Sequence, residues 1–181
     1  MPQRIFLKFI FLISFLGLQS CVNTPSRSCS DNWQITGYFT PVENNHHGKK
    51  ISIKVKNEKQ FPFAKTFLDA VKIEGWGKTR FGWYLGYYSQ QWHKSKWPLD
   101  STGRQLIHGI AATDPHFIAK GSSIKIKSDI SYLGNTTFIA RDVGSKIKNR
   151  HIDIYTGEGK SAKKRTFEIT GKHSICVHRP D

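Results

Sequence analysis

Three aspartates in the C-terminal part of the chain, Asp114, Asp142 and Asp153, are placed where a carboxyl group could transfer protons. Asp153 stands between two isoleucines in HIDIY, and this alternation of apolar and polar residues predicts a β-strand. Aspartate is depleted in strands, and a carboxyl group held beside apolar surface has a raised pKa, as a general acid requires. Asp114 and Asp142 directly follow apolar segments, where an aspartate either caps a turn or faces a site.

A dense run of aromatic residues precedes these aspartates. Residues 74–97 contain seven Trp and Tyr side chains, namely Trp76, Trp83, Tyr84, Tyr87, Tyr88, Trp92 and Trp97. Because sugar rings stack on aromatic faces, we expect part of this run, Trp76 and Trp83, to bind a glycan, and the rest to pack in the core. Glu74 is a candidate second carboxylate. His46 and His47 have no companion ligands at metal spacing, so we expect neither a metal nor a cofactor.

The segments that must position these side chains are mostly short and β-like. Strands are expected at residues 33–42, 51–56, 106–113, 122–127, 135–141, 151–155 and 174–177, and helices at 62–70 and 161–167. Residues 71–88 combine β-forming residues with four glycines, which favours strands joined by tight turns, and residues 92–104 are expected to form a loop. Many short strands and few helices indicate a small closed β architecture.

Composition limits the classes of protein that the chain can represent. Its 181 residues suit one domain, and a hydrophobic content of 38% excludes a disordered or collagen-like chain. Lys and Arg number 28 against 13 acidic residues, which gives a net charge of +15. This surplus predicts attraction to an anionic partner, which is a nucleic acid, an anionic membrane or an acidic polysaccharide.

The first twenty residues have the pattern of an export signal. Arg4 and Lys8 precede the apolar run FIFLISFLGL at residues 9–18, which is shorter than the ~20 residues that a membrane-spanning helix needs. A buried core helix is the alternative, but the polar residues 22–32 that follow resemble a linker and would not cover it. We therefore predict an exported protein, which argues against nucleic acid as the partner.

Residues 18–21, LQSC, resemble the lipobox of bacterial lipoproteins. The resemblance implies that Cys21 becomes the acylated first residue of the mature chain, anchored on the periplasmic side of the outer membrane; simple cleavage and release is the alternative. If Cys21 carries lipid, Cys29 and Cys176 are left to pair in an oxidising compartment. Two free thiols remain the alternative to that disulfide.

Five segments together resemble one protein family. They are TGYFTP at residues 36–41, IAATDP at 110–115, IAKGS at 118–122, ARDVGSKIK at 140–148 and IDIY at 152–155. Their order and spacing resemble the 3D (three-aspartate) domain of MltA-type peptidoglycan lytic transglycosylases. The resemblance implies a mainly β fold, a six-stranded double-psi β-barrel with few helices over residues 33–178. A linker at 21–32 would precede it, and a short insertion would occupy about residues 45–104.

The resemblance also implies an activity and a set of site residues. The family cleaves the β-1,4 bond between N-acetylmuramic acid and N-acetylglucosamine and leaves a 1,6-anhydromuramyl end. Its catalytic aspartate matches Asp153 and its supporting aspartate matches Asp142, while Thr36 and Tyr38 match positions that line the site. Asp114 is a further candidate for substrate binding. Ordinary glycosidases use two carboxylates; here the C6 hydroxyl of the sugar is the nucleophile, so one carboxyl group can act as acid and then as base.

Two positions depart from the family pattern. Ser145 and Asn149 stand where the family has glycine. Asparagine adopts positive φ more readily than most residues, whereas Ser145 would narrow or reshape a groove. These departures leave a second interpretation open, a non-catalytic peptidoglycan-binding lipoprotein with the same barrel. Because the insertion is short, we also expect a shallower cleft than in the larger enzymes.

Overall fold

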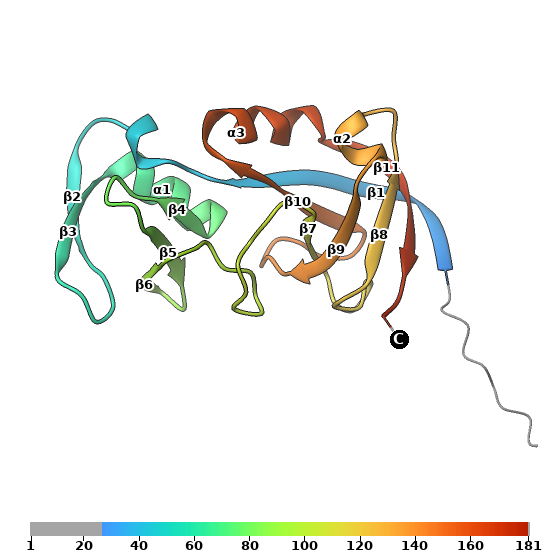
Figure 1. Cartoon of the computed structure of the whole chain (residues 1–181), viewed down its shortest axis with the longest axis horizontal. Coiled ribbons are helices and arrows are strands. Elements are labelled where there is room, and N and C mark those ends of the chain that lie inside the picture. Colours follow the sequence, from blue (N-terminus) through green and yellow to red (C-terminus); the bar gives the residue numbers. More distant parts are fainter. Residues whose placement is uncertain (1–26, 181) are drawn as a thin grey trace, which may run out of the picture.

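The computed structural model describes residues 27–180, which form a closed six-stranded barrel with a second lobe beside it (Figure 1). The barrel strands are β1 (Arg27–Thr40), β7 (Ile110–Thr113), β8 (Ser123–Lys127), β9 (Thr137–Asp142), β10 (His151–Glu158) and β11 (Gly171–His178). Their order around the barrel is β1-β10-β7-β9-β8-β11. The pairs β1–β10 and β7–β9 are parallel, whereas β1–β11, β10–β7, β11–β8 and β8–β9 are antiparallel. The mainly β fold with a closed six-stranded barrel is confirmed.

The expected signal peptide, residues 1–20, and the expected lipidation site, Cys21, lie outside the described residues. Strand β1 begins at Arg27, six residues before the expected start of the domain at Trp33, because Arg27–Ser30 pair with β11. A disulfide joins Cys29 to Cys176, which lie opposite each other in that ladder and 147 residues apart in sequence. Within residues 27–180, no helix is both long and apolar enough to span a membrane.

The barrel core follows from the alternation of side chains along its strands. Ile35 on β1 and Ile152 and Ile154 on β10 are fully buried. Thr36 on β1 lies opposite Asp153 on β10 in the parallel ladder, so both side chains occupy the other face of these two strands. The hydrophobic pattern that closes the barrel therefore also brings a hydroxyl group and a carboxyl group together.

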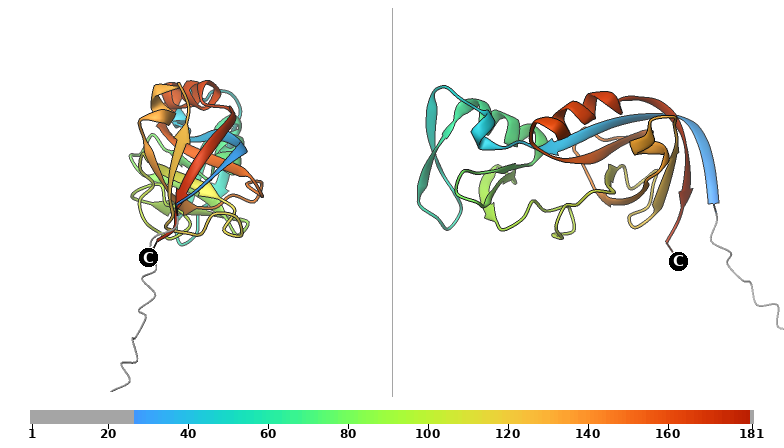
Figure 2. Two further views of the ribbon diagram at one scale, coloured as in Figure 1. Left: turned by 90° about the vertical axis from the view of Figure 1, so that its right-hand side faces the viewer. Right: turned by 45° about the horizontal axis from the view of Figure 1, so that its top comes forward.

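The second lobe consists of one helix, a hairpin and a three-stranded sheet. Its elements are η1 (Glu43–Asn45), β2 (Lys50–Lys54), β3 (Gln60–Ala64), α1 (Lys65–Glu74), β4 (Trp76–Lys78), β5 (Tyr84–Tyr88) and β6 (Gln91–Ser95). It has a hydrophobic core of its own, in which Phe63, Phe67, Val71 and Leu85 are fully buried. The insertion is thus a packed lobe at one end of an elongated molecule (Figure 2).

Two local expectations for this lobe differ from the structure. The helix expected at residues 62–70 begins at Lys65 and runs to Glu74, while Pro62 lies in β3. This strand pairs only with β2 in a two-stranded sheet, and proline is tolerated on such an edge. The loop expected at residues 92–104 begins with most of β6, which pairs with β5.

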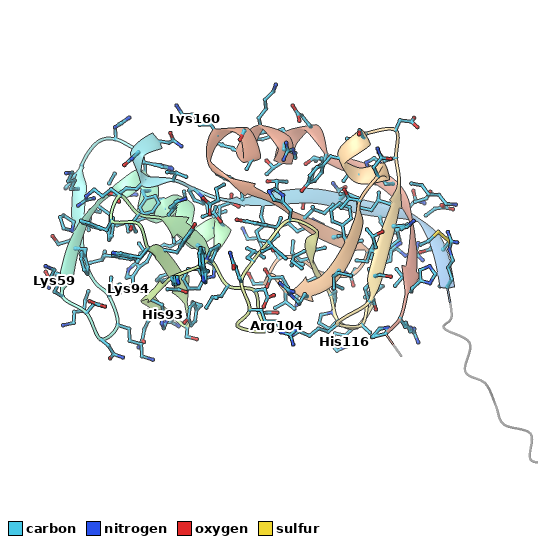
Figure 3. All side chains as sticks on the ribbon, viewed as in Figure 1. Lys59, His93, Lys94, Arg104, His116 and Lys160 are labelled. Atoms are coloured by element: carbon cyan, nitrogen blue, oxygen red, sulfur yellow. A yellow bond between two sulfur atoms is a disulfide. The ribbon has the colours of Figure 1, made fainter. Side chains whose placement is uncertain are left out.

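Two further helices lie on the barrel, α2 (Ser131–Gly134) and α3 (Gly159–Glu168), and α3 packs against β1 and β10. Exposed basic side chains occur on both lobes: Lys59 and Lys94 on the second lobe, Arg104 on the connecting loop and Lys160 at the start of α3 (Figure 3). The positive charge is therefore distributed along the whole molecule rather than confined to one element.

Candidate active site

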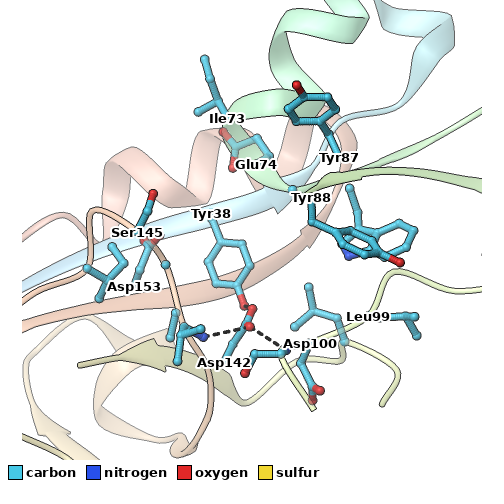
Figure 4. Close-up of a pocket in the computed structure, with 18 of the residues that line it drawn as sticks. Tyr38, Ile73, Glu74, Tyr87, Tyr88, Leu99, Asp100, Asp142, Ser145 and Asp153 are labelled. Atoms are coloured by element: carbon cyan, nitrogen blue, oxygen red, sulfur yellow. Dashed lines mark hydrogen bonds between the residues drawn. The ribbon is translucent and has the colours of Figure 1, made fainter. Parts of the chain in front are cut away.

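A cavity of about 760 Å³ lies between the barrel and the second lobe. The barrel contributes Tyr38, Asp142 and Asp153, and the second lobe contributes Glu74, Trp76 and Tyr88; residues 99–106 of the connecting loop complete the wall. Glu74, Asp142 and Asp153 are arranged around the side chain of Tyr38 (Figure 4). With Asp100 and Tyr87, which also line it, the cavity gathers four carboxyl groups and three aromatic rings of the second lobe.

Asp153 is held from one side by β1. The Thr36 hydroxyl donates a hydrogen bond to Asp153 Oδ1 at 2.6 Å, and Thr36 Oγ1 is also 2.8 Å from His151 Nε2. Burial raises the pKa of Asp153 above its ordinary value, and the nearby Asp142 adds to this, although the Thr36 bond and His151 oppose it. Asp153 therefore retains a proton at higher pH than a solvated aspartate does, as a general acid must.

Asp142 at the end of β9 is fully engaged in hydrogen bonds. Its Oδ2 accepts the Tyr38 hydroxyl at 2.8 Å, and its Oδ1 accepts the backbone N–H groups of Ser101 at 2.8 Å and Val143 at 2.9 Å. Burial raises the pKa of Asp142, and these hydrogen bonds reduce the shift. Burial and Asp142 together raise the pKa of Tyr38 well above its ordinary value, so Tyr38 stays a hydroxyl donor. This arrangement suits positioning rather than proton transfer.

Glu74, at the C-terminal end of α1, reaches from the second lobe to the barrel. Its Oε2 accepts the backbone N–H of Phe39 on β1 at 3.1 Å. Burial raises the pKa of Glu74 from its ordinary value of 4.5 to about 7; the Phe39 N–H opposes this shift, Asp153 adds to it and Lys163 opposes it. The sequence indicated Glu74 only as a candidate second carboxylate, and the structure places it in the same cavity as Asp153.

Further contacts join the second lobe and its connecting loop to the barrel. Glu158 at the end of β10 accepts hydrogen bonds from Lys78 Nζ at 2.9 Å and from the Tyr84 hydroxyl at 2.6 Å. On the connecting loop, the buried Asp100 forms an ion pair with Arg141 of β9. Although burial raises the pKa of Asp100, its hydrogen bonds keep that pKa below the ordinary value. Sequence reasoning missed this ion pair because nothing in the spacing links a loop aspartate to a strand arginine.

The two tryptophans assigned to glycan binding have different positions. Trp76 lines the cavity beside Tyr88, with ring centroids 6.0 Å apart. Trp83 does not line this cavity; it packs against Phe61 and lies parallel to Phe81 in the second lobe, with centroid distances of 5.3 and 6.0 Å. Trp83 therefore lies apart from this cavity, and its expected role in glycan binding stays a prediction.

Asp114 is also absent from the cavity wall. Its carboxylate accepts the backbone N–H groups of His116 at 3.1 Å and Asn149 at 2.9 Å, and these bonds lower its pKa. These bonds agree with the turn-capping interpretation of Asp114, while its assignment to substrate binding stays a prediction. Asn149 has φ of 58°, so it takes the left-handed conformation that the family's glycine would also allow. Ser145 lines the cavity and is exposed.

Among residues 27–180, no three His, Cys, Asp or Glu side chains are arranged as a metal ion would require. The side chains that line the cavity can form hydrogen bonds, transfer protons through carboxyl groups and stack on sugar rings.

Comparison with known proteins agrees with this architecture. Residues 110–176 match the 3D domain family. The structure resembles that of E. coli MltA with bound chitohexaose, at 16% identity over 83% of this chain and 73% of that chain, with a TM-score of 0.63. It also resembles MltA from Neisseria gonorrhoeae, at 12% identity over 84% of this chain and 72% of that one, with a TM-score of 0.58. No curated protein matches the chain. Residues 110–176 are thus similar to the 3D domain family, and the barrel has the fold of the MltA structures.

Proposed function

We propose that this protein is a peptidoglycan lytic transglycosylase that cleaves the β-1,4 bond between N-acetylmuramic acid and N-acetylglucosamine. The observation that carries the proposal is the Asp153 carboxyl group, which has a raised pKa and opens into a cavity of about 760 Å³. The MltA structure with bound chitohexaose, a linear glycan, supports a glycan as the ligand of this fold. Trp76 and Tyr88 offer aromatic faces on which sugar rings can stack.

The proposed reaction uses one carboxyl group twice. Asp153 donates its proton to the glycosidic oxygen while the bond from that oxygen to C1 of the muramic acid breaks. The resulting Asp153 carboxylate then takes the proton of the C6 hydroxyl, whose oxygen forms a new bond to C1 and closes the anhydro ring. No water is consumed, and the acid is regenerated. General acid and base catalysis of this kind contributes roughly 10²–10⁴ in rate.

The proposal is tested by incubating the purified protein with isolated sacculi and identifying the released muropeptides by mass spectrometry. We expect anhydro-muropeptides from the parental protein and a loss of at least about 10² in rate for Asp153→Asn. The control variant is Asp129→Asn, which removes an exposed aspartate before α2. If Asp153→Asn releases anhydro products at the parental rate, the assignment of Asp153 is wrong.

The same assay separates the second candidate function, a non-catalytic peptidoglycan-binding lipoprotein. Ser145 favours this alternative, since it lines the cavity where the family has glycine. A binding protein would sediment with sacculi and release no muropeptides, and Asp153→Asn would then behave as the parental protein does. Release of anhydro products by the parental protein excludes this alternative.

We also propose export and a lipid anchor at Cys21, on the basis of the N-terminal sequence. Cells grown with labelled palmitate are expected to label the parental protein and to leave Cys21→Ser unlabelled. The label should fractionate with the outer membrane. Labelling of the Cys21→Ser variant to the parental level would contradict the anchor.

A further inference from the structure

His151 lies beside the proposed catalytic carboxyl group. It precedes Asp153 by two residues on β10, so alternation places both side chains on the face opposite the buried Ile152 and Ile154. Its Nε2 is 2.8 Å from Thr36 Oγ1, and the same Oγ1 is 2.6 Å from Asp153 Oδ1. The three side chains therefore form one hydrogen-bonded row, in which Thr36 is the middle member.

The number of hydrogens in this row determines which atom donates in each hydrogen bond. A threonine hydroxyl has a single hydrogen to donate. An ionised carboxylate can only accept, so the hydrogen of Thr36 points to Asp153 Oδ1. The contact between His151 and Thr36 is then a hydrogen bond only if Nε2 of His151 carries a hydrogen and donates it. An unprotonated Nε2 would instead compete with Asp153 for the Thr36 hydrogen.

The other oxygen of Asp153 is left for chemistry. Within residues 27–180, Oδ2 of Asp153 accepts none of the hydrogen bonds found, whereas Oδ1 accepts the Thr36 hydroxyl. Among residues 27–180, the buried side-chain nitrogen or oxygen atom that lacks a hydrogen-bond partner is Ser122 Oγ. Because Oδ2 of Asp153 lacks a partner but does not belong to that class, Oδ2 is accessible rather than buried. Since Asp153 lines the cavity, Oδ2 is the oxygen that a ligand there can reach.

We propose that His151 is a positioning residue that donates from Nε2 to Thr36, fixes the Thr36 hydrogen on Oδ1 of Asp153 and thereby confines the transferable proton to Oδ2. This inference rests on the proposed function of Asp153. In the catalytic cycle the proton leaves Oδ2 for the glycosidic oxygen and returns to Oδ2 from the C6 hydroxyl. His151 and Thr36 keep their hydrogens throughout.

Two substitutions of His151 separate this role from simple packing. Gln has an N–H donor at about the distance of Nε2, so His151→Gln should keep the row, whereas His151→Leu fills similar space without a donor. With sacculi as substrate, we expect His151→Leu to lower kcat about tenfold at a nearly unchanged KM, and His151→Gln to stay within about threefold of the parental kcat. A loss of equal size in both variants would overturn the proposal.

The pH dependence of kcat/KM gives a second test, because it would not change if His151 served only to pack against its neighbours. The titratable groups around Asp153 are Glu74 from α1, Asp142 at the end of β9, Tyr38 on β1 and His151 on its own strand. The Thr36 bond and His151 both lower the pKa of Asp153. His151→Leu removes the His151 effect and weakens the Thr36 bond, so it should move the alkaline limb of kcat/KM upward by on the order of 0.5 pH unit. His151→Gln also lacks the imidazole but keeps the Thr36 bond, so it should move the limb less. An unmoved limb in His151→Leu would contradict the proposal.

A double-mutant cycle tests whether His151 acts through Thr36. Thr36→Val removes the middle member of the row, so His151→Leu should cause no further loss of kcat in that background. Additive losses of kcat would show that the two side chains act independently, and they would contradict the proposal that His151 acts through Thr36. Asp153→Asn with unchanged activity would instead defeat the proposed function itself, so the two failures are distinguishable.

The hydrogen on Nε2 can be observed without substrate. In the parental protein labelled with ¹⁵N-histidine, we expect the His151 signal, assigned by its absence from His151→Gln, to show a hydrogen on Nε2. A neutral imidazole with its hydrogen on Nδ1 would overturn the proposal. This measurement also decides the matter if His151→Leu proves to be unfolded.

Discussion

Replacing Glu74 with glutamine should stabilise the protein at alkaline pH and leave it unchanged at acid pH. Glutamine has nearly the same shape, and its Oε1 can still accept the Phe39 N–H that Glu74 Oε2 accepts at 3.1 Å. The substitution therefore removes a charge while it preserves the contact between α1 and β1. This makes Glu74→Gln a test of the buried charge alone.

The magnitude and sign follow from the raised pKa of Glu74. The folded carboxyl group titrates at about 7 instead of 4.5, so between these values the folded state holds a proton that the unfolded state has lost. The free energy of unfolding consequently falls as the pH rises from about 4.5 to about 7 and stays lowered above that. The full shift corresponds to on the order of 3 kcal/mol. Because the side chain is partly open to solvent, we expect about 1–3 kcal/mol.

Urea unfolding of the parental protein and of Glu74→Gln at pH 4, 6 and 8 measures this difference. We expect equal stabilities at pH 4 and a more stable variant at pH 8. Glu168→Gln, which changes an exposed carboxylate of α3, serves as the control and should change stability little at any of these pH values. A difference between Glu74→Gln and the parental protein that is the same at all three pH values would refute the reasoning.

Three other substitutions probe separate parts of the structure. Replacing both Cys29 and Cys176 with serine opens a loop of 147 residues and should cost up to about 4–5 kcal/mol in urea unfolding, and unchanged stability would contradict this role of the disulfide. Gly77→Ala would place its Cβ 2.7 Å from the ring of Phe67, so a loss of about 1–3 kcal/mol is expected, and an unchanged Tm would argue against that packing. Tyr38→Phe removes the hydrogen bond to Asp142, so kcat on sacculi should fall about tenfold while the variant still sediments with sacculi. Full activity of this variant would show that the Tyr38 hydroxyl has no role in the reaction.

The barrel was predictable because its signals are local. Isoleucines on both sides of Asp153 identified the strand and the face that the carboxyl group occupies. The turn after β7 was equally local, and Asp114 caps it as one of the two interpretations allowed. The meeting of Asp153 with Thr36 depends on the parallel pairing of β1 with β10, whose residues are 117 positions apart in sequence, and no spacing rule gives such a partner.

The second lobe was predicted less well for a physical reason. A proline in the first turn of a helix and a proline in an edge strand have similar local sequences, and pairing with β2 placed Pro62 in the strand. The aromatic run between residues 74 and 97 serves both lobe packing and the cavity wall. Whether a ring such as that of Trp83 faces inward depends on tertiary contacts with Phe61 and Phe81, which composition does not reveal.

The attachments between the second lobe and the barrel have a consequence for ligand binding. Three contacts hold the two halves where the chain leaves the barrel and where it returns: Glu74 of α1 with the Phe39 N–H of β1, Glu158 with Lys78, and Asp100 with Arg141. A molecule arriving in the cleft therefore meets walls whose spacing is already set. Binding of this preorganised kind sacrifices little conformational freedom of the protein, so affinity would depend mainly on how well the ligand fits.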